Sequence, residues 1–272
     1  MTQKDEFVIG IDRGASFTDF AVVDSNKITE SRSITKRDWD SVQAVFEELL
    51  KKYPTEHIAF TGSAADMPSA LEAKFTLISE MDAIGFGGAA LADAEECIVV
   101  SMGTGTAVVQ YQDQSARHIG GTGIGGGTIK GLGSLICGID DPIELEKLAL
   151  EGKAANVNLT IGDLGYNHIS YLGPDATASN FASIKTNNPQ DLAAGILTLV
   201  AETVGIIVSI CAREAGRSQK LVMVGRVANN QFIRRHLEPV GKLYQAEFII
   251  PADPGLATVF GTTVKYRFDL GG

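Results

Sequence analysis

The chain has 272 residues, of which 44% are hydrophobic and 21% charged, and its formal net charge is −10. This length suffices for one large domain or two small ones around a sizeable core. The acidic balance argues against a nucleic-acid-binding protein, which needs a basic face, and against a protein that binds an anionic membrane surface. No apolar run approaches 18 residues without interruption, so no membrane-spanning helix is expected.

The N-terminal sequence and the cysteines indicate in which cellular compartment the protein is expected. The opening sequence MTQKDEFVIGID leads directly into a strand and lacks the form of a signal peptide. Cys97, Cys137 and Cys211 are isolated in apolar surroundings without CxxC spacing, and the histidines show no metal-ligand spacing. We therefore expect a cytoplasmic protein without structural zinc.

The first part of the chain alternates strands and helices. A strand at 7–12 ends in the carboxylate of Asp12, and a short Gly/Ser turn joins it to a second strand at 17–23. Apolar residues at i, i+3, i+4 and i+7 from Val42 predict an amphipathic helix at 40–53. The further elements expected here are strands at 28–34, 57–62 and 97–101 and a helix at 81–92.

The later part repeats this alternation more weakly. The longest helical pattern, 190–215, is uniformly apolar over 196–211, so it is expected in a core or a subunit interface. A strand at 221–225 ends in Gly225. The other elements expected here are helices at 142–151, 230–237 and 255–266 and a strand at 248–250.

The stretch 101–133 carries two clusters of glycine and threonine on either side of an alternating run that predicts a β-hairpin. Glycine allows close backbone approach, and threonine places a hydroxyl beside exposed N–H groups. Such N–H nests and helix N-termini bind phosphate, and ligands of α/β sheets lie beyond the carboxyl ends of strands. The stretch therefore predicts a polyphosphate site without a P-loop.

The glycine clusters, and the charged residues near them that could take part in binding or catalysis, each have a plainer interpretation when taken alone. A glycine cluster is typical of tight turns, and Glu80 would be a surface or helix-capping carboxylate. Asp82 would be an N-cap. Lys130 would lie on a solvated helix face, and Arg226 in a solvated turn.

Taken together, the motifs resemble those of the actin-like ATPase and sugar-kinase superfamily, and within it the type II pantothenate kinases. The resemblance covers essentially the whole chain. It rests on GTGTA (103–107), IGGTGIGGGTIKGLG (119–133), SEMDA (79–83), NLTIGDL (158–164), ATASNFA (176–182) and the segments 200–216 and 224–237. It implies an α/β fold of two duplicated, ribonuclease H-like lobes with mixed sheets flanked by helices. We place the lobes at 1–100 and 101–272.

The resemblance also implies roles for individual residues. Glu80 would be the catalytic base that accepts the proton of a hydroxyl, and Asp12 would hold Mg²⁺ and orient the phosphates of ATP. Asp82 is a weaker candidate for the metal. The residues implied in ATP binding are Gly14, Ser16, Thr18, Gly103, Thr104, Gly105, Thr106, Gly126, Gly127, Thr128, Lys130, Gly225 and Arg226.

Two departures from the family pattern stand out. Where the family usually has D-x-G-G-T-L-x-K, this chain has DRGASFTD at 12–19, so Asp19 replaces a lysine. The ending FTD resembles the first loop of hydantoinase and oxoprolinase ATPases. His118 stands where the family has an arginine that contacts the substrate carboxylate. Arg117 precedes it, but adjacent strand side chains face opposite ways, so Arg117 is not an easy substitute.

The leading hypothesis is an ATP- and Mg²⁺-dependent kinase for the primary hydroxyl of pantothenate, the first step of coenzyme A biosynthesis, or of a close analogue such as pantetheine. Arg117 and His118 are the candidate substrate-binding residues. A kinase for another small hydroxy acid, a nucleotide-binding sensor or pseudokinase, and an ATPase partner of a larger enzyme remain alternatives. The resemblance further implies a homodimer, with 196–211 in the interface.

Overall fold

The structure is a computed structural model that describes residues 7–35, 38–169, 172–216 and 220–271. Two five-stranded mixed sheets form its framework, and both follow one plan. Three antiparallel strands are extended by two parallel ones, in the order β3-β2-β1-β4-β5 and, read in the same sense, β8-β7-β6-β11-β12. The duplicated α/β architecture expected from the resemblance is therefore present.

The first sheet is built from residues early in the chain. Its strands are β1 (Val8–Arg13), β2 (Thr18–Asp24), β3 (Lys27–Ile34), β4 (Ile58–Gly62) and β5 (Thr76–Leu77). Helix α1 (Trp39–Lys52) covers one face of this sheet and buries Val42, Phe46 and Leu49, as its apolar spacing predicts. Asp38 caps the helix by accepting a hydrogen bond from the Ser41 amide at 2.8 Å.

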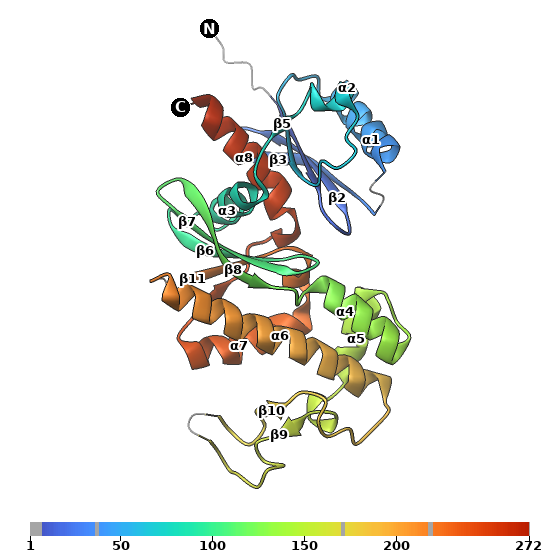
Figure 1. Cartoon of the computed structure of the whole chain (residues 1–272), viewed down its shortest axis with the longest axis vertical. Helices are drawn as coiled ribbons and strands as arrows, with labels where there is room; N and C mark the ends of the chain where they lie inside the picture. The colour runs from blue at the N-terminus through green and yellow to red at the C-terminus, as the bar shows by residue number, and fades with distance from the viewer. Residues whose placement is uncertain (1–6, 36–37, 170–171, 217–219, 272) are drawn as a thin grey trace.

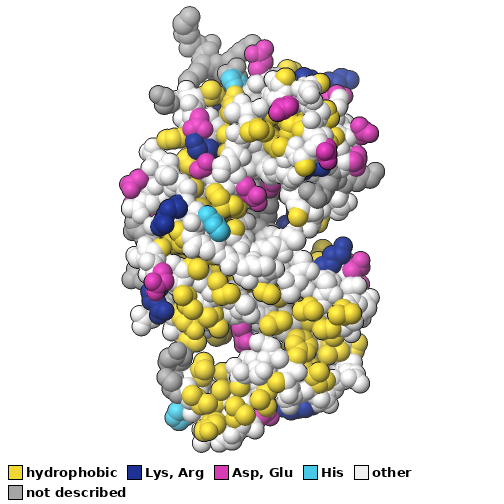
Figure 2. Space-filling view, in the orientation of Figure 1, with side chains coloured by type: hydrophobic (Ala, Val, Ile, Leu, Met, Phe, Trp, Pro, Cys, Tyr) yellow, Lys and Arg dark blue, Asp and Glu magenta, His cyan; other side chains and the backbone are white. Residues whose placement is uncertain are grey.

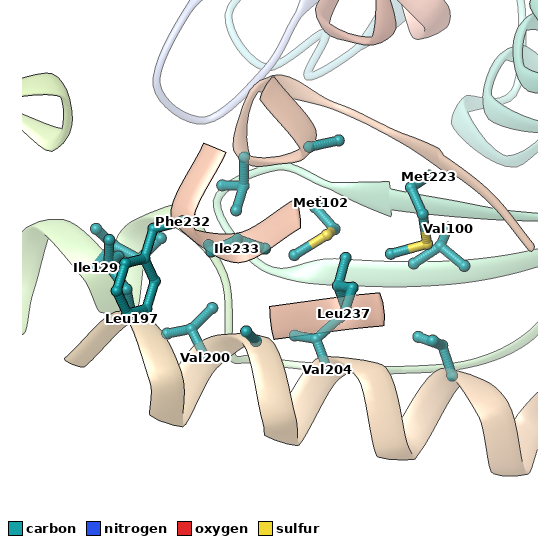
Figure 3. Close-up of a cluster of buried hydrophobic side chains, with 14 of the residues drawn as sticks. Val100, Met102, Ile129, Leu197, Val200, Val204, Met223, Phe232, Ile233 and Leu237 are labelled. Atoms are coloured by element: carbon teal, nitrogen blue, oxygen red, sulfur yellow. The ribbon is translucent and has the colours of Figure 1, made fainter. Parts of the chain in front are cut away.

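The second sheet is built from both halves of the chain, because β11 and β12 pair beside β6. Its strands are β6 (Cys97–Met102), β7 (Thr106–Gln112), β8 (Ser115–Thr122), β11 (Lys220–Val224) and β12 (Glu247–Ile249). Side chains alternate along β6: Val99 faces helix α3 (Glu80–Leu91), and Val100 and Met102 face helix α6 (Pro189–Glu214). Figure 3 shows the core on the α6 side, where Met102 and Met223 lie above Val200 and Val204.

Helix α3 and the closing helix α8 (Ala257–Gly271) lie between the two sheets (Figure 1). They cross with their backbones in contact, and glycine makes this possible. A Cβ atom at Gly261 would lie 1.8 Å from the Ala83 carbonyl oxygen, and one at Gly87 would lie 1.9 Å from the Ala257 carbonyl oxygen. The closing helix thus packs on the first sheet; the lobe boundary at residue 100 stays a prediction.

Helix α6 covers the outer face of the second sheet. Helix α6 is long and apolar enough to cross a membrane, but 61% of its apolar stretch is buried inside the molecule, against β6, β11 and their neighbours. The apolar pattern of this helix therefore marks a core helix. The other elements are α2 (Ser69–Glu72), α4 (Gly126–Leu132), α5 (Pro142–Glu151), α7 (Gln231–Tyr244), β9 (Leu159–Thr160) and β10 (Thr177–Ser179).

Two helices run further than their sequence patterns indicate. Helix α7 was expected to end at Leu237, before Pro239, but it continues to Tyr244. The extension is stabilised by packing, since Val240 and Gly241 are buried and Gly241 lies against Phe248 of β12. Helix α8 likewise continues five residues beyond Tyr266, to Gly271.

Candidate active site

Three polar side chains form a row across the carboxyl end of β1. Asp12 pairs in register with Asp19 on β2 and with Thr61 on β4. Residues paired in this way project from the same face of a sheet. That face carries α8, because Ile11 and its neighbours pack under α1, whereas a Cβ atom on Gly10 would lie 2.6 Å from Thr263 of α8. The row therefore faces the space between the two sheets.

Asp12 lies in an electrostatic environment that disfavours its charge. Burial, followed by the negative charges of Asp19 and Glu80, raises the pKa of its carboxyl to about 8, and Arg226 partly offsets this. Glu80 is the exposed first residue of α3. The fold thus brings together the two carboxylates to which the resemblance assigns the chemistry, from positions 68 residues apart in the sequence.

Arg226 reaches the first sheet from the carboxyl end of β11. Its guanidinium donates hydrogen bonds to the Asp19 carboxylate and, at 3.0 Å, to the Ser33 hydroxyl. It also stacks over the Phe17 ring, 4.0 Å from the ring centroid. Asp19 is only 7% exposed. The carboxylate that replaces the family lysine therefore has its own cation, supplied by the other sheet.

The turn after β1 and the Gly/Thr loop after β6 meet at one place. The turn 14–17 and the loop 103–105 touch through the hydroxyls of Ser16 and Thr104, whose oxygens are 3.0 Å apart. Each segment follows the first strand of its sheet, β1 and β6. The carboxyl ends of the two duplicated strands therefore face each other, which is the geometry expected of a shared phosphate site.

The second glycine cluster serves to join two loops. The amides of Gly126 and Gly127 donate to the carbonyls of Gly103 and Thr104, each at 2.8 Å. A Cβ atom at Gly126 would lie 2.9 Å from the Gly103 carbonyl oxygen, so the loops fit only because this position lacks a side chain. These two N–H groups are thus already occupied, and they support the loop 103–105 from behind.

The threonines predicted in ATP binding differ in accessibility. The Thr106 hydroxyl donates to the Ile124 carbonyl at 2.8 Å, and Thr128 donates to the Gly123 carbonyl at 3.3 Å. Thr18 is fully buried at the start of β2, whereas Thr104 and Lys130 are exposed. Of these side chains, Thr104 is exposed at the contact between the loops, and Lys130 lies at the surface of α4.

Arg117 and His118 lie on opposite faces of the second sheet. Ala116 packs on the α3 side, where a Cβ atom at Gly85 would lie 2.6 Å from its own Cβ. His118, two residues on, shares that side, whereas Arg117 points away and donates to the Gln110 side chain at 2.7 Å. His118 is therefore the one of the two that lies on the Glu80 side.

The sequence marks Arg13 only as a positive charge that could replace the missing lysine, at a different point and direction. Arg13 donates to the carbonyls of Ser63 and Ala65 at 2.8 and 3.3 Å and lies over the Trp39 ring, so it fixes the turn after β4. No sequence motif marks Ser33 or Thr61, because strand pairing places them beside Asp19 and Asp12. Only the position of Thr61 beside Gly62, whose φ is +88°, hinted at a special strand end.

The donor set suits a cation held mainly by ligand and water oxygens. Among the described residues, no three His, Cys, Asp or Glu side chains cluster closely enough to form a protein metal cage. A single carboxylate at the phosphate loops fits Mg²⁺, which keeps several waters and binds through one or two carboxylates plus phosphate oxygens. A cation there would also offset the repulsion that Asp12 receives from Asp19 and Glu80.

Comparison with known proteins gives the family. The model of the family described as Fumble matches residues 90–246, more than half of the chain. The chain belongs to the Fumble family. Curated relatives of this Fumble protein include a type II pantothenate kinase from Bacillus thuringiensis subsp. konkukian, 27% identical over 251 residues that cover 88% of each chain. Another, from Staphylococcus aureus strain USA300, is 27% identical over 85% of this chain and 88% of its own.

Solved structures share the architecture of the Fumble protein at lower sequence identity. The activator of 2-hydroxyisocaproyl-CoA dehydratase from Clostridium difficile, with bound ADPNP, has a TM-score of 0.63 and 18% identity, covering 97% of both chains. A ROK family glucokinase from Streptomyces griseus, in complex with glucose and AMPPNP, has a TM-score of 0.61 and 13% identity over 96% of this chain and 99% of its own. These likenesses confirm the actin-like ATPase fold.

Proposed function

We propose that this protein is an ATP-dependent kinase that phosphorylates the primary hydroxyl of pantothenate or a close analogue, the first step of coenzyme A biosynthesis. One observation carries the proposal. Asp12 lies beside two touching loops, between the sheets of an actin-like fold, and the charge of Glu80 acts on its carboxyl. The type II pantothenate kinases among the relatives support the choice of acceptor.

Each part of the site has a task in this reaction. Glu80 is exposed at the start of α3 and accepts the proton of the attacking hydroxyl. The loops at 14–17 and 103–105 surround the phosphates of ATP. Arg226 follows Gly225 at the end of β11 and reaches Asp19 beside these loops, where it binds the nucleotide. Asp12 would hold Mg²⁺, which supplies charge neutralisation to the phosphates when it is bound.

The assembly we propose is a homodimer acting in the cytoplasm. Helix α6 leaves Ile206, Ile207 and Ile210 partly uncovered. On the face drawn in Figure 2, hydrophobic side chains also gather over α4 and α5, where Leu135 is 81% and Ile143 is 64% exposed. Apolar surface of this kind is typical of a site where another protein binds.

A coupled ADP-release assay with Mg²⁺ and ATP tests the kinase activity. The acceptors are pantothenate, pantoate, pantetheine and small hydroxy acids. We expect turnover with one of them, and a loss of 10²–10⁴-fold in kcat for Glu80→Gln with ATP still bound, because general base catalysis is worth about that factor. If Glu80→Gln kept full activity, Glu80 would have no part in the chemistry.

His118 favours a second candidate, a kinase for a different small hydroxy acid. An imidazole carries little charge at neutral pH and lacks the guanidinium fork that grips a carboxylate. We expect His118→Arg to lower the KM for pantothenate by about tenfold, because a charged hydrogen bond is gained. Arg117→Gln, on the opposite face, should leave this KM unchanged. If His118→Arg lowered no acceptor's KM, position 118 would have no influence on the choice of acceptor.

A further inference from the structure

Thr61 carries a buried hydroxyl that has no hydrogen-bond partner. Its side chain is 1% exposed, and its Oγ1 atom is one of three buried side-chain N or O atoms left unpaired among the described residues. Leaving such a group unpaired destabilises a fold, whereas valine would fill the same space without that penalty. A hydroxyl at this position suggests a partner that it meets only when the site holds a ligand.

The place of this hydroxyl in the sheet points to that partner. Thr61 pairs in register with Asp12, on the side of β1 away from Asp19. Both side chains project toward the space between the sheets, next to the loops that meet at Ser16 and Thr104. Asp19 occupies the opposite flank of Asp12 in the same row, so Thr61 presents the neutral hydroxyl beside this carboxylate.

We propose that Thr61 is a positioning residue of the phosphate site, whose hydroxyl holds the Asp12 carboxylate when that carboxylate is charged and engaged with nucleotide. This inference rests on the proposed function, because it assigns Asp12 to the phosphates of ATP. Thr61 touches neither reactant. It acts by fixing one orientation of the carboxylate, as a donor beside a metal-binding carboxylate does in other sites.

The test compares Thr61→Val, which removes only the hydroxyl, with Thr61→Ser, which keeps it. Calorimetric titration with Mg²⁺ and ADPNP measures binding, and the ADP-release assay measures kcat. We expect Thr61→Val to weaken ADPNP binding about tenfold, the worth of a hydrogen bond to a charged group. Thr61→Ser should stay within about threefold of the wild type. In the absence of nucleotide, Thr61→Val should raise the Tm by about 2–4 °C.

The chain offers a matched control. Thr198 in α6 is 3% exposed and its Oγ1 is also unpaired, but it lies in the core of the second lobe. Thr198→Val should therefore raise the Tm while ADPNP binding and kcat stay at wild-type values. If Thr61→Val behaved in the same way as Thr198→Val, the Thr61 hydroxyl would be a tolerated defect and the proposal would be overturned.

A double-mutant cycle with Asp12→Asn separates this inference from the proposed function. If Thr61 acts through Asp12, Thr61→Val should have no further effect on ADPNP binding in the Asp12→Asn background. The same cycle on chemical unfolding at pH 9 needs no nucleotide. If the protein phosphorylates no acceptor but the two substitutions are coupled in unfolding, the proposed function is contradicted and the link between Thr61 and Asp12 is supported. Additive effects in both cycles would remove the link alone.

Discussion

At the scale of single residues, Asp12 lies in surroundings that lower the stability of the folded protein. Its carboxylate is partly buried beside Asp19 and Glu80, and its pKa is raised from 3.8 to about 8. Such an arrangement weakens the free protein and is typical of functional sites, where like charges are kept together for a ligand. Arg226 relieves only part of this repulsion, because it is paired with Asp19.

Asp12→Asn should therefore stabilise the free protein as it abolishes activity. Because the folded state holds the Asp12 proton more tightly than the unfolded state, the contribution of Asp12 to stability falls as pH rises from about 4 to 8 and then levels off. We expect a gain in unfolding free energy for the variant that is near zero at pH 4 and reaches about 1–3 kcal/mol above pH 8. Chemical denaturation at a series of pH values measures this.

Asp113, in the exposed turn between β7 and β8, offers the matched control. Asp113→Asn removes the same charge at a position whose φ of +51° asparagine also adopts. Its stability should follow the wild type at every pH. A pH-independent gain for Asp12→Asn would contradict the assignment of the raised pKa to this carboxyl.

At the scale of elements, the crossing of α3 and α8 positions the two carboxylates that we propose for catalysis. The crossing holds the start of α3, with Glu80, against the sheet that carries Asp12. It depends on Gly87 and Gly261, whose backbones lie closer than any side chain would allow. In the sequence these glycines are only small residues within helical patterns. Their role in allowing close backbone contact follows from the positions of both helices.

Gly261→Ala should disrupt this crossing. The added Cβ would lie 1.8 Å from the Ala83 carbonyl oxygen, a backbone atom that cannot move without shifting α3. Overpacking of this kind costs about 1–3 kcal/mol or more, so we expect a loss of at least about 2 kcal/mol in unfolding free energy and a lower kcat. Gly131→Ala in α4, where no atom lies within 4 Å of the new Cβ, should leave both quantities near the wild type. Equal stability of the two variants would show that α3 and α8 can move apart at no cost, so the close crossing would not depend on Gly261.

At the scale of the whole molecule, the sequence predicts the local structure and the loops. Apolar spacing marks α1 and α6, and strands that end in Asp12, in the GTGT loop and in Gly225 predict a phosphate site, because these signals depend on neighbours within a few residues. It also identifies the duplicated fold through motif resemblance.

Which side chains come into contact depends on the folded chain as a whole. Several contacts join residues from different strands or loops: Asp19 with Arg226, Asp12 with Thr61, and the amides of Gly126 and Gly127 with the loop 103–105. The folded sheet also places Arg117 and His118 on opposite faces. Strand register and helix crossing set these contacts, and both depend on packing over the whole chain, which local spacing does not encode.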